Sequence, residues 1–188
     1  KFISVLKGEV LSSPPIWFMR QAGRYLPEYR AVREEIGGFL DLCYDPEKAA
    51  RVTMQPIERF DLDAAILFAD ILLIPQSMGQ SLWFEKGEGP RLAPSVSTSH
   101  LSFEKDANPA LLDPVYETVR KVRAELDKDK ALIGFAGAPW TVATYMINGK
   151  GSKDPSALRL FAYQHPEIFD KLIRQLTENT VEYLARQI

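Results

Sequence analysis

Two arginines near the start of the chain could bind an anion. Arg20 and Arg24 follow an apolar run and flank a pair of small residues. A guanidinium group is permanently charged, and its planar fork matches a carboxylate in bidentate geometry. Gly23, between them, would let the backbone approach a ligand closely or adopt a positive φ. The spacing predicts a carboxylate site, and the alternative is a pair of surface salt bridges with Glu28 or Glu34.

An isolated carboxylate, Asp70, interrupts a stretch that is otherwise almost wholly apolar from Ala64 to Pro75. Burying a carboxylate without a partner costs on the order of several kcal/mol. One interpretation is that Asp70 caps a helix over Ile71–Met78, because Asp fills that role well. The other is a functional role at the end of a strand. The two are compatible, since a capping carboxylate keeps acceptor lone pairs free.

A third group of residues combines small side chains with a phenol. Gly134, Gly137 and Ala138 lie at the end of another apolar run, and small side chains at a strand end indicate tight packing or a close ligand. Tyr145 comes soon after them and could donate a hydrogen bond. A tyrosine on a buried helix is more often part of the core, so its position alone assigns it no role.

The elements that must position these residues alternate between short apolar runs and helices. The runs are Pro15–Met19, Ala64–Phe68 and Ala131–Phe135, and none alternates polar with apolar residues. Strands that are apolar on both faces are typical of a parallel sheet covered by helices. The order therefore predicts βα repeats, with the candidate residues at strand ends, where such folds gather their active sites.

Helix starts are predicted at three Asp-Pro pairs, which are Asp45–Pro46, Asp113–Pro114 and Asp154–Pro155. Asp accepts hydrogen bonds from first-turn amides, and Pro fits the first helical position. A last helix is expected to run to the end of the chain. Its apolar face comprises Ile168, Leu172, Ile173, Leu176 and Leu184.

No linker, repeat or low-complexity tract divides the chain, so we expect a single domain over residues 1–188. Segments 81–85 and 91–96 flank a glycine-containing turn and predict a hairpin inserted at about 81–96. Three predicted strands could form an open sheet, whereas a closed parallel barrel needs eight. In the second case the domain would be incomplete at its C-terminal end.

Composition excludes several functional classes. The chain has 188 residues, a net charge of -2 and 46% hydrophobic residues, which is typical of a folded protein without nucleic-acid or membrane partners. No apolar run approaches the roughly 20 residues of a membrane helix, and no signal peptide is visible. One cysteine and two widely separated histidines predict neither a disulfide nor a metal site. We therefore expect a cytoplasmic protein.

The chain resembles the uroporphyrinogen decarboxylase family in several segments that follow the family's order. They are Pro15–Tyr29, Asp61–Leu72, Leu132–Thr141 and Thr144–Met146, and the first is long enough to be highly specific. The resemblance implies a (β/α)8 TIM barrel about twice as long as this chain. The chain would then cover about the first half of the barrel, and we expect that piece alone to be inactive.

The resemblance also implies an activity. Members of the family are carboxy-lyases of haem biosynthesis that remove carbon dioxide from the four acetate side chains of uroporphyrinogen and release coproporphyrinogen. They are homodimers and need no metal or organic cofactor. Loss of carbon dioxide needs an electron sink, which a pyrrole protonated at a ring carbon supplies, and a nearby carboxylate stabilises the resulting cation. The group that delivers the proton stays open.

Site residues are carried over by position. The substrate-binding residues are Arg20, Gln21, Ala22, Gly23, Arg24, Phe39, Asp70 and Tyr145. Those with an implied catalytic role are Arg20, Arg24, Asp70 and Tyr145. The arginines would bind substrate carboxylates, Asp70 would receive the pyrrole N–H groups, and Tyr145 would contact the substrate near the reacting acetate.

Two alternatives stay open. A corrinoid-linked methyltransferase on a related barrel would bind zinc through His and Cys in its later half. It would not be expected to carry the full Arg20–Glu28 stretch. A non-enzymatic half-barrel that binds porphyrin would show binding without turnover.

Overall fold

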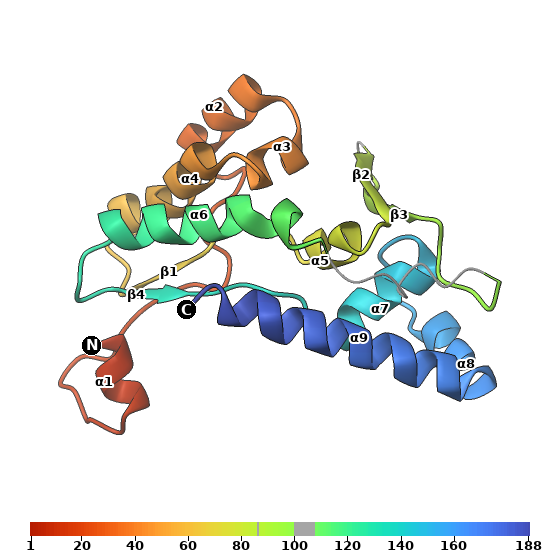
Figure 1. Ribbon diagram of the computed structural model, residues 1–188. Helices are drawn as coiled ribbons and strands as arrows, with labels where there is room; N and C mark the ends of the chain where they lie inside the picture. Colours follow the sequence, from red (N-terminus) through yellow and green to blue (C-terminus); the bar gives the residue numbers. More distant parts are fainter. Residues whose placement is uncertain (86, 100–107) are drawn as a thin grey trace. The chain divides into compact units, whose positions relative to one another are not determined.

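The computed structural model describes residues 1–85, 87–99 and 108–188 (Figure 1). Contacts divide the chain into two compact units. The first comprises Lys1–Ala69, Asp113–Phe135 and Gln187, and the second comprises Asp70–Leu112, Ala136–Arg186 and Ile188. The expectation of one domain over residues 1–188 stays a prediction.

Each unit combines helices with a pair of short strands. The elements of the first unit are α1 (Phe2–Leu6), α2 (Pro27–Ile36), α3 (Phe39–Cys43), α4 (Pro46–Phe60), β1 (Ala64–Ile66) and β4 (Ala131–Ile133). Those of the second are α5 (Leu73–Ser77), β2 (Ser81–Glu85), β3 (Gly89–Ala93), α7 (Pro139–Asn148), α8 (Ser156–Gln164) and α9 (Pro166–Ala185). Helix α6 (Pro109–Glu125) begins in the second unit and continues in the first.

Strands β1 and β4 pair in parallel, with Ala64 opposite Ala131 and Ile66 opposite Ile133. Two of the three predicted strands are therefore confirmed, although each has only three residues. Helices α4 and α6 cover this pair, as the apolar composition of the strands requires.

The strand predicted over Pro15–Met19 is wrong, because these residues form no strand. Ile16 alone in this run bonds to the start of β1. The Asp63 N–H donates to the Ile16 carbonyl at 2.9 Å, and the Asp63 carboxylate accepts the Ile16 N–H at 2.8 Å. Farther along β1, a side chain takes the place of a neighbouring strand, as described below.

Helix α4 joins the two parts of the first unit's core because it is apolar on two faces. Ala50, Met54 and Ile57 recur at helical spacing and pack with Val122 and Leu126 of α6. A second face buries Val52 in a cluster with Leu26, which directly precedes α2, and with residues of α2 and α3, which are Tyr29, Val32 and Leu42.

The first predicted helix start is confirmed. Helix α4 begins at Pro46, and the Asp45 carboxylate accepts the Lys48 N–H at 3.0 Å. The third lies one residue later than predicted, because α8 begins at Ser156. The N-cap residue is Pro155 and not Asp154, although the Asp154 carboxylate accepts the Ser156 N–H at 2.9 Å just before the helix.

The second predicted start, at Asp113–Pro114, is wrong. Helix α6 begins earlier, at Pro109, and Pro114 lies inside it. The Asn108 side chain accepts the Ala110 N–H at 3.2 Å, so an Asn-Pro pair performs the role that we expected of the Asp-Pro pair. The prediction failed because it considered only Asp before Pro.

In the second unit, α7 and α8 pack against α9. Helix α9 buries Leu172 and Leu176 as predicted, but it ends at Ala185 and leaves Leu184 37% exposed. Its inward face near the C-terminus is formed instead by Thr180 and Tyr183. Strands β2 and β3 are antiparallel. No helix in the part of the chain that the structure describes is long and apolar enough to span a membrane.

Candidate active-site residues

The residues singled out from the sequence fall into two groups. Arg20–Arg24 and Phe39 belong to the first unit, whereas Asp70 and Tyr145 belong to the second.

Gln21 holds the arginine segment against β1. Its side chain is 4% exposed. The Gln21 Nε2 donates to the Ala64 carbonyl at 2.8 Å, and its Oε1 accepts the Ile66 N–H at 3.1 Å. Both ends of the amide are therefore engaged with the strand backbone.

Arg20 and Arg24 are both exposed, and among the described residues neither has an acidic partner. Glu28, the first partner considered for them, instead binds Arg59. The two N–O distances of that bidentate pair are 2.7 and 2.9 Å. The pairing lowers the pKa of the Glu28 carboxyl, chiefly through the hydrogen bond from Arg59. Glu28 is thus not available to the two arginines, which favours the anion-binding interpretation.

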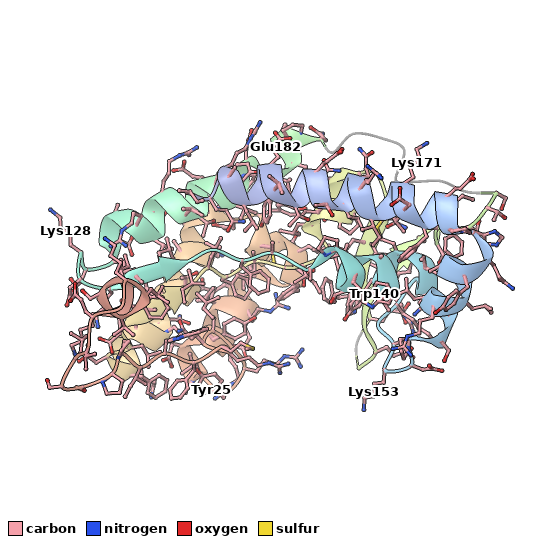
Figure 2. The ribbon with its side chains drawn as sticks, turned by 90° about the horizontal axis from the view of Figure 1, so that it is seen from below. Tyr25, Lys128, Trp140, Lys153, Lys171 and Glu182 are labelled. Atoms are coloured by element: carbon pink, nitrogen blue, oxygen red, sulfur yellow. The ribbon has the colours of Figure 1, made fainter. Side chains whose placement is uncertain are left out.

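The turn between the arginines is covered by Tyr25, whose hydroxyl donates to the Gln21 carbonyl. Gly23 does not have a positive φ, so that part of the expectation is wrong. A methyl group at Gly23 would lie 3.4 Å from the Tyr25 ring, which is ordinary contact. The outer part of Tyr25 reaches the surface of the first unit (Figure 2).

Phe39, the first residue of α3, lies in an aromatic cluster with Phe68, which follows β1. Its ring packs edge-on against Phe68, with ring centres 5.7 Å apart, and Tyr29 contacts Phe68 at 6.0 Å. The Arg33 guanidinium lies 5.7 Å from the centre of the Phe39 ring, in a cation–π contact. The Phe68 N–H donates to the Thr53 hydroxyl at 3.1 Å, which fixes the backbone here.

Asp70 caps a turn. Its carboxylate accepts the Leu72 N–H at 2.8 Å, and the helix that follows, α5, is shorter than the predicted Ile71–Met78. Burial raises the pKa of the Asp70 carboxyl above its ordinary value, and the hydrogen bond from Leu72 opposes that rise. One hydrogen bond leaves most of the carboxylate lone pairs available to a ligand.

Gly137 packs against the residue that follows Asp70. A side-chain carbon at Gly137 would lie 2.8 Å from Ile71 Cβ and 2.6 Å from a methyl group of Val142, so only glycine fits. The small residues at this strand end were expected to allow either tight packing or a close ligand, and the structure shows tight packing at Gly137. The contact ties the segment around Asp70 to the start of α7.

Tyr145 is half-buried on α7, and its ring lies against the turn at Gly151. A side-chain carbon at Gly151 would lie 3.1 Å from the Tyr145 hydroxyl. Within the described residues the hydroxyl makes no hydrogen bond, so it is free to donate to a ligand.

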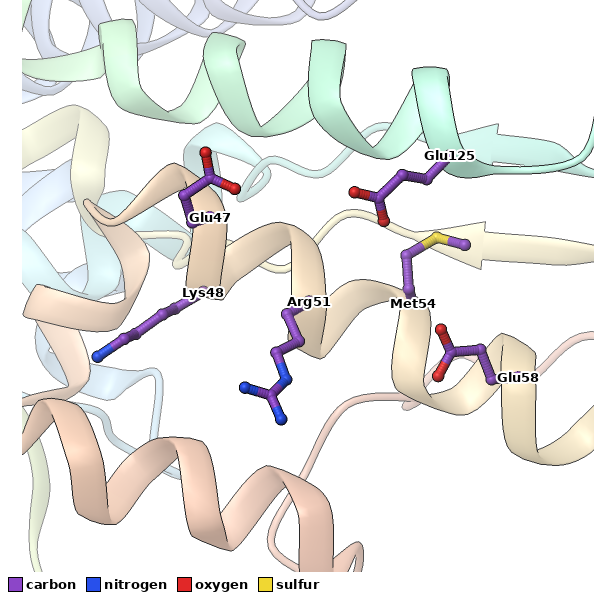
Figure 3. Close-up of a pocket in the computed structure, with 6 residues that line it drawn as sticks. All are labelled: Glu47, Lys48, Arg51, Met54, Glu58 and Glu125. Carbon is purple, nitrogen blue, oxygen red and sulfur yellow. The ribbon is translucent and has the colours of Figure 1, made fainter.

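A pocket of about 340 Å³ lies elsewhere in the first unit, on α4 (Figure 3). Its charged lining is mixed: Lys48 and Arg51 are basic, and Glu47, Glu58 and Glu125 are acidic. Glu125 extends from α6 toward Met54 (Figure 3). The pocket contains none of the residues predicted to bind substrate.

Sequence reasoning missed two side chains that fix the backbone near these segments. Thr53 binds Phe68 as described. The Gln187 amide accepts the Phe135 N–H at 2.8 Å and donates to the Phe135 carbonyl at 3.1 Å. Both partners are distant in sequence, and no local pattern signals either contact.

Comparison with known proteins gives consistent results. The family model described as uroporphyrinogen decarboxylase (URO-D) matches residues 1–188. Uroporphyrinogen decarboxylase from Caulobacter vibrioides is 57% identical over 188 residues, which are 100% of this chain and 53% of that protein. The one from Ruegeria pomeroyi is 58% identical over 192 residues, covering 100% of this chain and 55% of that protein. The chain thus spans about half the length of the curated relatives it matches.

A solved structure, a methyltransferase from Methanosarcina mazei, matches the fold with a TM-score of 0.73. The match covers 98% of this chain and 53% of that one at 18% identity, so it is evidence of fold alone. The fold class is that of the (β/α)8 barrels, of which the chain covers about half. Because the family model matches the chain from end to end, the chain belongs to the uroporphyrinogen decarboxylase family.

Proposed function

We propose that the full-length protein, meaning this chain extended to the length of its relatives, is a carboxy-lyase. It converts uroporphyrinogen to coproporphyrinogen in haem biosynthesis. The proposal rests on Arg20 and Arg24, which are exposed and have no acidic partner among the described residues. Hydrogen bonds from Gln21 hold their segment against β1. A substrate with eight carboxylates needs such cations. The identity to uroporphyrinogen decarboxylases along the whole chain supports the same conclusion.

The proposed chemistry assigns each charged residue one task. Arg20 and Arg24 bind substrate carboxylates through charge-assisted hydrogen bonds. Protonation of a pyrrole ring carbon creates a cation that accepts the electron pair of the breaking bond as carbon dioxide leaves. The Asp70 carboxylate accepts pyrrole N–H groups and stabilises that cation.

The remaining residues bind and orient the substrate. Ala22 and Gly23 leave room for the substrate beside the backbone, and the Tyr145 hydroxyl donates to it near the reacting acetate. Phe39 offers a ring whose other neighbours are Phe68 and Arg33. No metal or organic cofactor takes part in the proposed reaction, since the protonated pyrrole itself is the electron sink.

The test is product analysis after incubation with uroporphyrinogen under reducing conditions. We expect intermediates with progressively fewer carboxylates and then coproporphyrinogen. Chelator-treated protein should give the same products, and residues 1–188 alone should give none. Unchanged uroporphyrinogen after incubation with the full-length protein would refute the proposal.

Two alternatives make different predictions. The methyltransferase alternative has support only from a fold match, and it predicts bound zinc and methyl transfer to a corrinoid. A porphyrin-binding half-barrel predicts binding by residues 1–188 without turnover. Metal analysis and a binding assay separate both from the decarboxylase.

We further propose that the full-length protein is a cytoplasmic homodimer without nucleic-acid or membrane partners. The near-zero net charge of residues 1–188 supports the absence of nucleic-acid partners. Sedimentation analysis of the full-length protein measures its mass in solution. A mass equal to one chain would contradict the homodimer.

A further inference from the structure

We propose that Gln21 is a positioning residue, whose side chain holds the Arg20–Arg24 segment on β1 and does not itself bind the substrate. The inference rests on the proposed function, because it concerns how the carboxylate-binding arginines are held. It differs from the role implied by the family resemblance, in which Gln21 is one of the substrate-binding residues.

The Gln21 side-chain amide makes the hydrogen bonds to β1 that the backbone of a neighbouring parallel strand would make. In a parallel sheet, one residue of a neighbouring strand donates to a carbonyl and accepts an N–H two residues farther along. The Gln21 side chain does both, toward Ala64 and Ile66. On the opposite edge of β1, β4 uses the alternate groups, since the Ala131 N–H donates to Asp63 and the Leu67 N–H donates to Ile133.

Within the described residues, the segment from Ile16 to Gln21 makes hydrogen bonds to β1 and the residue before it at its two ends only. Ile16 bonds to Asp63, the residue before β1, and Gln21 bonds one and three residues farther along, at Ala64 and Ile66. In the described part of the chain, residues 17–20 make no hydrogen bond to β1, and Met19 is 81% exposed. Arg20 lies directly beside the second point of attachment.

Loss of the Gln21 amide would therefore release the arginine segment. The remaining contacts are local: the Tyr25 hydroxyl binds the Gln21 carbonyl, and the Leu26 N–H binds the Gly23 carbonyl at 3.0 Å. These contacts preserve the turn but not its place on β1. The two guanidinium groups would keep their charge and lose their fixed position, which weakens binding more than it slows the chemical step.

The chain offers a matched control in Gln187. It is the same residue type, it is 8% exposed, and its amide makes two hydrogen bonds to the backbone of Phe135. It holds no arginine segment. Gln21→Ala and Gln187→Ala each remove two buried hydrogen bonds, so a purely structural role predicts similar effects from both.

The experiment compares the two variants in the full-length protein by steady-state kinetics, thermal unfolding and amide hydrogen exchange. For Gln21→Ala we expect KM for uroporphyrinogen to rise about tenfold, with kcat within about twofold of wild type. Amide exchange should accelerate at Ile66 and across residues 20–26. Gln187→Ala should lower the melting temperature similarly but leave KM unchanged and accelerate exchange at Phe135 only.

Gln21→Glu supplies a conservative rescue. The protonated acid can donate to Ala64 and accept from Ile66 as the amide does, whereas the carboxylate cannot donate. The KM of Gln21→Glu relative to wild type should fall toward one as the pH is lowered. A KM increase equal in Gln21→Ala and Gln187→Ala, or a loss confined to kcat, would overturn the inference. Absence of turnover in wild type would refute the proposed function instead, and hydrogen exchange would still test whether Gln21 holds the segment.

Discussion

The carboxylate of Asp70 accepts the backbone N–H of Leu72 at 2.8 Å and caps the turn that leads into α5. The predicted helix cap is therefore wrong, because the N-cap residue of α5 is Leu72 and that helix has no side-chain cap. Asp70 stabilises only the preceding turn, and a single hydrogen bond leaves the functional interpretation intact because it occupies only part of the carboxylate. Burial makes the ionised form costly in the folded chain. A neutral residue of the same shape would cap as well at lower cost, so stability alone does not account for an aspartate here.

The first prediction separates these two roles. Asn caps a turn about as well as Asp, so Asp70→Asn should keep the melting temperature of the full-length protein or raise it. If Asp70 stabilises the pyrrole cation, coproporphyrinogen formation should fall about a hundredfold, equivalent to roughly 3 kcal/mol of transition-state stabilisation. Product analysis and thermal unfolding measure the two effects. Near-normal turnover of Asp70→Asn would contradict a catalytic role and leave Asp70 only its hydrogen bond to Leu72.

A second prediction concerns the pH dependence of stability. The pKa of Asp70 is higher in the folded chain than its ordinary value of 3.8. Its destabilising effect is thus absent below that ordinary value and grows as the pH rises through the folded pKa. The free energy of unfolding of Asp70→Asn, relative to wild type, should therefore increase as the pH rises from the ordinary value of 3.8 through the folded pKa. A constant difference over that range would contradict the direction of the pKa shift.

Arg24 provides the third prediction. Arg24→Ala in the full-length protein should weaken porphyrinogen binding by roughly tenfold or more, since charge-assisted hydrogen bonds contribute about 1.5–3 kcal/mol. The melting temperature should change little, because Arg24 is exposed and has no acidic partner among the described residues. Arg51→Ala is the control: it removes an exposed arginine from α4. Equal affinity of Arg24→Ala and Arg51→Ala would refute the assignment.

The fourth prediction tests the close packing at Gly137. Gly137→Ala would place a methyl group within 2.8 Å of Ile71 and should destabilise the fold by about 1–3 kcal/mol. Because Ile71 adjoins Asp70, turnover per folded molecule should fall as well. Val142→Ala removes the other close contact, at 2.6 Å, so the double variant should recover part of the stability. Denaturant unfolding measures this; a Gly137→Ala variant as stable as wild type would show that the packing adapts.

Local patterns in the sequence determined the elements whose causes are themselves local. The Asp45–Pro46 pair starts α4, because a cap and a proline act within one helical turn. The apolar runs containing β1 and β4 identify buried parallel strands, because burial on both faces requires continuous apolar residues. The residue types at Arg20, Arg24 and Asp70 likewise indicate which positions could bind a charged substrate.

Tertiary structure decided which backbone groups these elements bond to. The run Pro15–Met19 has the composition of a strand, yet its Ile16 bonds to the Asp63 side chain and the side chain of Gln21 takes the hydrogen-bonding positions beside β1. Gln187 does the same at Phe135. These partners lie 43 to 52 residues apart, and a hydrogen bond over such a separation depends on where the fold brings the two segments. No periodicity of apolar residues encodes it, because the amide that completes the strand edge is a single polar side chain.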